Sequence, residues 1–258
     1  MAKAKVYIGI GHGGSDPGAC ANGMRETDLA LTIGNYCTSY LRAAGVEVCQ
    51  SRTADIDDDL NDKIRRCNAY YPAVAIDVHI NAGAGQGFEV WAAQNSTAGH
   101  KLAACIESFV KSHAGQSSRG IKTKAGSSGA DYFGWNRLVN APSLILEAAF
   151  IDGAKDAAFL GDKNNLRRMG EAYAKGILQY LGIADNGTTT ATDADRATEK
   201  EKGCKCMYKT FNDVPAWAQA TVKKLMDAGA LQGDNNGNIN LSDDMCRTFV
   251  ILDRMGKL

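Results

Sequence analysis

The chain carries no excess of charge of either sign. Its 258 residues include 29 Lys and Arg against 29 Asp and Glu, which gives a formal net charge of zero at pH 7. A protein that binds nucleic acid needs a basic surface to neutralise the phosphates. We therefore expect no nucleic-acid partner.

Long hydrophobic runs are missing as well. No apolar run approaches the roughly 20 residues that a membrane-spanning helix needs, which predicts no membrane insertion. The N-terminal stretch MAKAKVYIGIGHGG is apolar only briefly before Gly11 and His12, whereas a signal peptide needs a longer apolar core and a small-residue cleavage site. We therefore expect a protein that is made in the cytoplasm without a signal peptide.

The remaining composition, 45% apolar and 22% charged, is that of an ordinary globular protein. The length allows one sizeable α/β domain and a small module. The cysteines of the first domain stand mostly among apolar neighbours, which predicts small buried thiols; they are Cys20, Cys37, Cys49, Cys67 and Cys105. Cys204 and Cys206 form a CxC, a weak metal signal, and their role and that of Cys246 stay open.

A polar stretch divides the chain. Residues 184–203, ADNGTTTATDADRATEKEKG, contain no large apolar residue, which is typical of a solvated linker. This predicts a first domain over residues 1–183 and a small module over 204–258.

Apolar periodicity in the first domain alternates between strand and helix, and this alternation predicts an open, largely parallel or mixed sheet with helices on both faces. Residues 115–131 are rich in glycine and serine and predict a long loop. The expected helices cover 26–44, 58–71, 97–113 and 164–181, and the expected strands cover 5–11, 46–50, 74–80, 87–93, 143–150 and a short segment near 132–138.

The last part of the chain predicts two short helices. The apolar face of the first is formed by Trp217, Val222, Leu225 and Met226, and that of the second by Met245, Phe249, Leu252 and Met255. Two short helices bury little area alone, so we expect them to pack on each other or to associate with a second copy.

Three candidate site residues stand where predicted strands end. His12 follows the run YIGIG, His79 ends VAIDVHI, and Glu147 ends SLILE. Open α/β sheets carry their active sites at the carboxyl ends of the strands, so these residues are expected to share one site. Glu26, at the start of a predicted helix, completes the set.

Two imidazoles and one carboxylate are the ligands of a hydrolytic zinc site, with a fourth position open for water. His12, Glu26 and His79 supply that set. Glu147 lies inside an apolar run, where a carboxylate is costly without a partner, which makes it the candidate proton acceptor. Each residue alone has a structural explanation, and Asp16 is better explained as a turn former than as a partner of a ligand histidine.

The blocks VYIGIGHGGSDPGA with a later RE, SRTAD, NAYYPAVAIDVHINA with GFEV, and APSLILEAAFID resemble, in order and spacing, those of the zinc-dependent N-acetylmuramoyl-L-alanine amidases of the third type. The resemblance covers residues 5–181. It implies a twisted sheet of about six strands flanked by helices, with His12, Glu26 and His79 as Zn²⁺ ligands and Glu147 as the catalytic carboxylate. It also implies cleavage of the amide between N-acetylmuramic acid and L-alanine in peptidoglycan.

The missing signal peptide favours a phage endolysin over a bacterial autolysin, because an endolysin is made in the host cytoplasm and reaches the wall after release through a membrane opened by a holin. The residues leave a zinc peptidase that cuts a stem-peptide bond, or a non-catalytic wall-binding protein, as alternatives. Residues 204–258 resemble a short helical repeat of lysins, which predicts wall binding or, as the second interpretation, a homo-oligomer.

Overall fold

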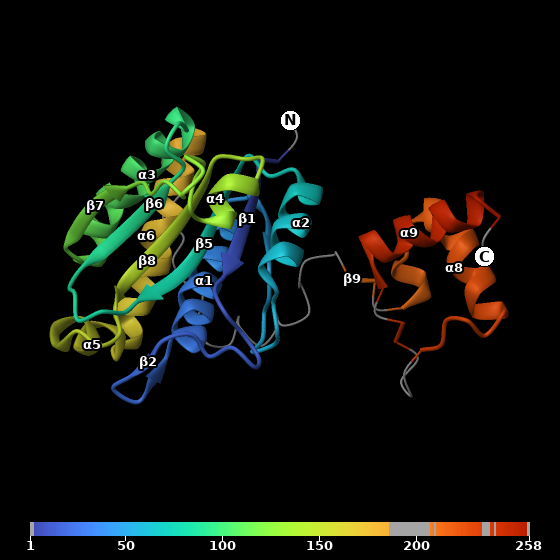
Figure 1. Cartoon of the computed structure of the whole chain (residues 1–258), viewed down its shortest axis with the longest axis horizontal. Helices are drawn as coiled ribbons and strands as arrows, with labels where there is room; N and C mark the ends of the chain where they lie inside the picture. Colours follow the sequence, from blue (N-terminus) through green and yellow to red (C-terminus); the bar gives the residue numbers. More distant parts are fainter. Residues whose placement is uncertain (1–2, 186–206, 209, 234–237, 240, 257–258) are drawn as a thin grey trace. The chain divides into compact units, whose positions relative to one another are not determined.

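The computed structural model describes residues 3–185, 207–208, 210–233, 238–239 and 241–256 (Figure 1). The chain falls into two compact units, Met1–Gly203 and Cys204–Leu258. The linker expected at 184–203 lies, apart from its first two residues, outside the described part, as do Cys204 and Cys206. None of the described helices is both long and apolar enough to cross a membrane.

A six-stranded sheet in the order β4-β1-β5-β8-β6-β7 forms the centre of the first unit. Its neighbouring strands are parallel except for β6 and β8, which are antiparallel. The predicted α/β class with a largely parallel or mixed sheet of six strands is therefore confirmed. The strands are β1 (Lys5–Ile10), β4 (Glu47–Gln50), β5 (Val74–Asn81), β6 (Phe88–Ala92), β7 (Ser118–Lys122) and β8 (Ser143–Phe150).

Helices cover both faces of the sheet (Figure 1). Val6 and Ile8 of β1 join the core that the sheet forms with α1, α3 and α6. Tyr7 points to the opposite face, as alternation along a strand requires, and its ring contacts Tyr70 of α2 and Trp135 of α4. The helices are α1 (Glu26–Ala43), α2 (Leu60–Tyr70), α3 (Thr97–Phe109), α4 (Gly134–Leu138), α5 (Ala154–Leu160) and α6 (Lys163–Leu181).

Glycines on α6 allow close packing against α1 and α3. A Cβ at Gly170 would lie 2.5 Å from the carbonyl oxygen of Ile33, and one at Gly176 would lie 2.5 Å from Cα of Ile106. Both obstacles are backbone atoms, which cannot rotate away. The close contacts of α6 with α1 and with α3 therefore depend on the absence of a side chain at these two positions.

Gly176→Ala should consequently destabilise the protein, because overpacking outweighs the gain in helix propensity. We expect a loss of about 1–3 kcal/mol in the free energy of unfolding, measured by denaturant titration. Gly134→Ala is the matched control, since a Cβ there meets only the ends of flexible side chains, Leu60 at 3.4 Å and Arg137 at 3.9 Å. Equal stability of the two variants would contradict this packing.

The structure differs from the predictions at several places in the first unit. The segment near 132–138 is not a strand but contains the short helix α4. Trp135 of this helix is buried, and a buried aromatic residue in so short a segment fits a strand as well as a helix. The expected loop 115–131 contains the edge strand β7, and α5 was not predicted.

Cys49 is disulfide-bonded, so the prediction of a thiol is wrong there. The other cysteines of this domain are free, but only Cys37 and Cys67 are buried as predicted, whereas Cys20 is exposed and Cys105 is partly exposed.

In the second unit the two predicted helices are present, as α8 (Ala216–Asp227) and α9 (Asp243–Arg254), and they pack on each other. The predicted apolar faces are partly wrong, because Trp217, Met245 and Met255 are exposed. The core between α8 and α9 contains mostly smaller residues. A short antiparallel strand pair, β9 (Met207–Tyr208) and β10 (Leu241–Ser242), also belongs to this unit. Its core contains Val214, Ala218, Val222, Ile239, Leu241, Cys246 and Val250.

Candidate active site

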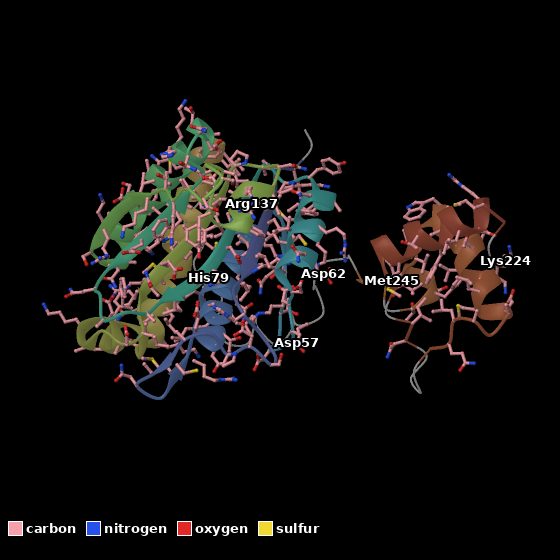
Figure 2. All side chains as sticks on the ribbon, in the orientation of Figure 1. Asp57, Asp62, His79, Arg137, Lys224 and Met245 are labelled. Atoms are coloured by element: carbon pink, nitrogen blue, oxygen red, sulfur yellow. The ribbon has the colours of Figure 1, made fainter. Side chains whose placement is uncertain are left out.

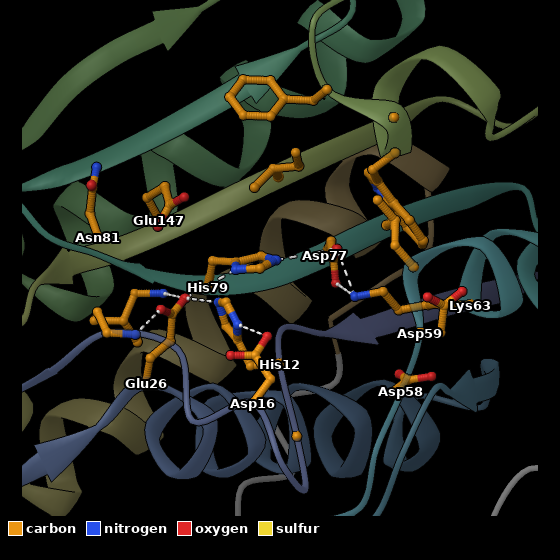
Figure 3. A pocket seen from close by; sticks show the side chains of 18 of the residues that line it. His12, Asp16, Glu26, Asp58, Asp59, Lys63, Asp77, His79, Asn81 and Glu147 are labelled. Carbon is orange, nitrogen blue, oxygen red and sulfur yellow. Dashed lines mark hydrogen bonds and ion pairs between the residues drawn. The ribbon is translucent and has the colours of Figure 1, made fainter.

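The four candidate residues lie around one cavity at the carboxyl edge of the sheet (Figure 3). His12 lies in the loop after β1, Glu26 is the first residue of α1, and His79 lies near the end of β5. One donor atom from each of these three residues lies within 4.8 Å of the other two. Glu147 of β8 is the register partner of His79 on the neighbouring strand.

Glu26 lies between the two imidazoles and is only 4% exposed. Its Oε1 is 3.1 Å from Nε2 of His12 and 3.0 Å from Nδ1 of His79. The backbone N–H of Ile80 donates to Oε1 and that of Ala19 donates to Oε2, both at 2.9 Å. The carboxylate is therefore fixed by main-chain donors from β5 and from the loop that precedes α1.

Each imidazole turns its second nitrogen to an aspartate. Nδ1 of His12 is 2.7 Å from Oδ2 of Asp16, and Nε2 of His79 is 3.3 Å from Oδ2 of Asp77. Metal-binding histidines usually give their second ring N–H to such a carboxylate, which fixes the ring. With one nitrogen of each ring facing Glu26, the donor set fits a single Zn²⁺ ion.

Asp16 combines two functions. Besides the contact to His12, its Oδ1 accepts the N–H of Gly18 at 3.0 Å, and its backbone pairs with Gly13. The turn-forming function that the sequence favoured is present, and the contact to a candidate ligand, which the sequence placed second, is present as well.

The cluster is strongly coupled electrostatically. Burial opposes ionisation of Glu26, but hydrogen bonds from His12 and His79 hold the pKa of its carboxyl well below the ordinary value. Burial lowers the pKa of His79, yet the charge of Asp77 and the hydrogen bonds that the imidazole donates to carboxylates raise it to about 10. Without a metal, His79 therefore keeps a proton at neutral pH, and a cation that binds there must displace it.

The aspartate that contacts His79 belongs to a buried ion pair. Nζ of Lys63 lies 2.8 Å and 2.9 Å from the two carboxylate oxygens of Asp77, and the residues are 3% and 2% exposed. Burial opposes the charge on Asp77, but Lys63 and His79 keep the pKa of its carboxyl low. Neither residue was singled out in the sequence as part of the site, although an aspartate inside the run VAIDVHI was a detectable signal.

Glu147 has a different environment from Glu26. Its Oε2 is buried and has no hydrogen-bond partner among the described residues. Burial raises the pKa of its carboxyl to about 7, because the attraction of His79 only partly offsets the loss of hydration. A carboxyl that titrates near neutral pH at the edge of a cavity suits proton transfer.

The cavity measures about 900 Å³ and has walls of different chemistry. One side carries the acidic residues Asp57, Asp58 and Asp59, which precede α2. The apolar lining of the cavity includes Phe133 and Trp135.

The raised pKa of Glu147 predicts a pH-dependent stability. The native carboxyl titrates at about 7 and the unfolded one near 4.5, so between these values the native state binds more protons and loses stability as the pH rises. Metal-free Glu147→Gln lacks this loss. Its stability relative to wild type should rise by at most about 3 kcal/mol between pH 4 and pH 8.5.

Thermal unfolding of the metal-free proteins at several pH values measures this difference. Glu47→Gln serves as the control, because Glu47 is exposed and its replacement should give a smaller pH-dependent difference. A difference in stability between Glu147→Gln and wild type that stays constant across this pH range would show that the charge of Glu147 does not destabilise the protein.

The other histidines of the first unit do not join the cluster. His113, in the π-helical turn Val110–Ala114, pairs with Glu171 at 2.7 Å. His100 lies on α3 and its Nε2 is buried. Both are partly exposed.

Several known proteins are similar to this chain. A family model described as N-acetylmuramoyl-L-alanine amidase matches residues 6–179. The endolysin of Bacillus phage SPP1 is 32% identical over 250 residues, covering 91% of this chain and 89% of the relative. The sporulation-specific N-acetylmuramoyl-L-alanine amidase of Bacillus subtilis strain 168 is 32% identical over 182 residues and covers 69% of each chain.

Solved structures give the same result for the first unit. The N-acetylmuramoyl-L-alanine amidase AmiC2 of Nostoc punctiforme is 27% identical, with a TM-score of 0.64, and the match covers 70% of this chain and 98% of that one. An N-acetylmuramoyl-L-alanine amidase from Clostridium difficile 630 is 26% identical, with a TM-score of 0.64 and coverage of 70% and 97%.

Proposed function

Because the chain belongs to the N-acetylmuramoyl-L-alanine amidase family, we propose that His12, Glu26 and His79 hold the Zn²⁺ ion with which it hydrolyses peptidoglycan. The reaction itself, hydrolysis of the amide between N-acetylmuramic acid and L-alanine, is that of the family. The observation that carries the metal proposal is the position of the Glu26 carboxylate, within 3.1 Å of a ring nitrogen of each histidine.

Glu147 is the proposed catalytic carboxylate. A zinc ion, when bound, polarises the substrate carbonyl and makes water a stronger nucleophile. Glu147 accepts the proton of the attacking water and returns it to the amine of L-alanine as the amide bond breaks. Its unpartnered oxygen and a pKa of about 7 support this function, since the carboxylate is available and its proton affinity is matched to neutral pH.

Asp16 and Asp77 fix the two imidazoles in this proposal. Lys63 balances the charge of Asp77, so that the cluster does not carry an additional uncompensated anion. The side chains that bind the ion are thereby held before it arrives, which reduces the conformational cost of binding.

We further propose that the chain acts as a phage lysin on the cell wall after its release from the host. The similarity to the SPP1 endolysin supports this, because a match over 91% of the chain is too long to be confined to Met1–Gly203. A bacterial autolysin is the second candidate, supported by the Bacillus subtilis amidase that matches over the catalytic part.

The unit Cys204–Leu258 is proposed to bind the wall, with self-association as the second candidate. Exposed Trp217 and Met255 on its surface support an interaction function. Co-sedimentation of the full chain with cell walls, combined with its mass by light scattering, separates the two. A monomer that sediments with walls supports wall binding, and a dimer that stays in solution supports self-association.

Incubation of the purified chain with cell walls tests the proposed chemistry. We expect new N-terminal alanine among the products, and no activity in the presence of a chelator. New reducing sugar ends would contradict amidase chemistry. Mass spectrometry of the released peptides distinguishes an amidase from a peptidase, because only the amidase leaves the stem peptide intact from its L-alanine.

A further inference from the structure

The loop that carries His12 has a backbone shape that needs external support. The φ angles of His12, Gly13 and Gly14 are 57°, 137° and 58°. A positive φ is uncommon for a residue with a Cβ, and such a conformation persists only where the surrounding structure fixes it. The surrounding structure here is the segment 51–59, which connects β4 to α2.

Two aspartates of this segment bind the loop through its backbone. Oδ1 of Asp57 accepts both the N–H and the hydroxyl of Ser15 at 2.7 Å, and Oδ1 of Asp55 accepts the N–H of Gly14 at 2.8 Å. The two segments touch closely, since a Cβ at Gly13 would lie 2.2 Å from the carbonyl oxygen of Ile56.

The same segment also holds the start of α1, which carries Glu26. Oδ2 of Asp55 accepts a hydrogen bond from Arg25 at 3.1 Å, directly before Glu26. Arg52, which is 2% exposed, donates to the carbonyl oxygens of Gly11 at 2.8 Å and Thr27 at 3.0 Å. Gly11 precedes His12 and Thr27 follows Glu26, so one guanidinium joins the neighbours of both candidate ligands.

We infer that Arg52, Asp55 and Asp57 form a brace that sets the separation of His12 and Glu26 and thereby the affinity for the metal. This inference rests on the proposed metal site. The brace residues are positioning residues, because their hydrogen bonds go to the neighbours of His12 and Glu26 in the chain. Removing Asp55 and Asp57 frees the loop to relax from its left-handed conformation, which separates His12 from the other donors.

Zinc affinity of the full chain, measured by competition with a chromophoric chelator, tests the brace. Asp55→Ala/Asp57→Ala should bind zinc about 10- to 100-fold more weakly than wild type, the usual effect of losing groups that support metal ligands. Both aspartates are exposed, so we expect the Tm of the metal-free variant to change little. Asp57→Asn should bind zinc nearly as well as wild type, because an amide oxygen still accepts from Ser15.

Asp62→Ala is the matched control, which removes a partly exposed aspartate of α2 that pairs with Arg65. Figure 2 shows that Asp62 lies apart from Asp57. It should keep wild-type affinity. Unchanged zinc affinity in the double variant would overturn the brace, as would an equal loss in Asp62→Ala, which would indicate a general effect of negative charge. A wild-type chain that binds no zinc at all would instead refute the proposed function on which the brace depends.

Discussion

Glu147→Gln should lower kcat for wall hydrolysis by about 10²- to 10⁴-fold, the usual contribution of a general acid–base residue, while the protein still binds zinc. Glutamine has nearly the same shape but cannot accept the proton of the attacking water. The substitution also removes the cost of a buried charge, so the variant should fold at least as well as wild type. Loss of activity with retained metal and fold is the combination that identifies a proton-transfer residue.

Steady-state kinetics on cell walls and a zinc assay of the same preparation measure both properties. Glu89→Gln is the matched control, because Glu89 is the register partner of Glu147 on β6 and is equally surrounded by strands. Its carboxylate is occupied by Arg119 and Lys122, both at 2.5 Å, and it does not line the cavity. Glu89→Gln should keep most of its activity, and wild-type turnover by Glu147→Gln would remove that residue from the mechanism.

His79→Ala should abolish stoichiometric zinc binding and with it the activity. The substitution removes one of three donors and leaves Glu26 and Asp77 without the imidazole between them. We expect the affinity for zinc to fall by more than the roughly 100-fold that the loss of a supporting group causes. Equilibrium dialysis against zinc, followed by elemental analysis, gives the stoichiometry.

His113→Ala is the control for this experiment. His113 lies in the same unit but pairs with Glu171 and does not line the cavity. It should bind one zinc ion per chain and remain active. Equal zinc content in His79→Ala and wild type would mean that the ion, if present, is held elsewhere.

The sequence predicted the central sheet well because its strands are marked by burial. The strands β1, β5 and β8 are almost continuously buried. The sequences of such strands are nearly unbroken apolar runs, which are easy to detect. Edge strand β7, with the sequence SRGIK, has no such pattern and was missed. The segment near 132–138 was predicted as a strand because its aromatic residues indicate burial. It is instead a helix of only five residues, which is too short to show a helical period.

Three of the four candidate site residues were predictable because each interrupts an apolar pattern. A histidine or glutamate buried at the end of an apolar run is costly unless a partner compensates for its lost hydration. His12, His79 and Glu147 all stand at such positions, which marks them as candidates for a site. Arg52, Asp55 and Asp57 stand at no such position, since they belong to a polar segment whose importance arises only from contacts to residues far away in the chain. The pairing of Lys63 with Asp77 is likewise a long-range contact that periodicity cannot show.

The most direct test of the central claim is the anomalous scattering of a zinc-loaded crystal at the zinc absorption edge. We expect a single strong peak per chain, bonded to His12, Glu26 and His79 and facing Glu147. A peak bound by other residues, such as Cys246, or the absence of any peak in active protein, would contradict it.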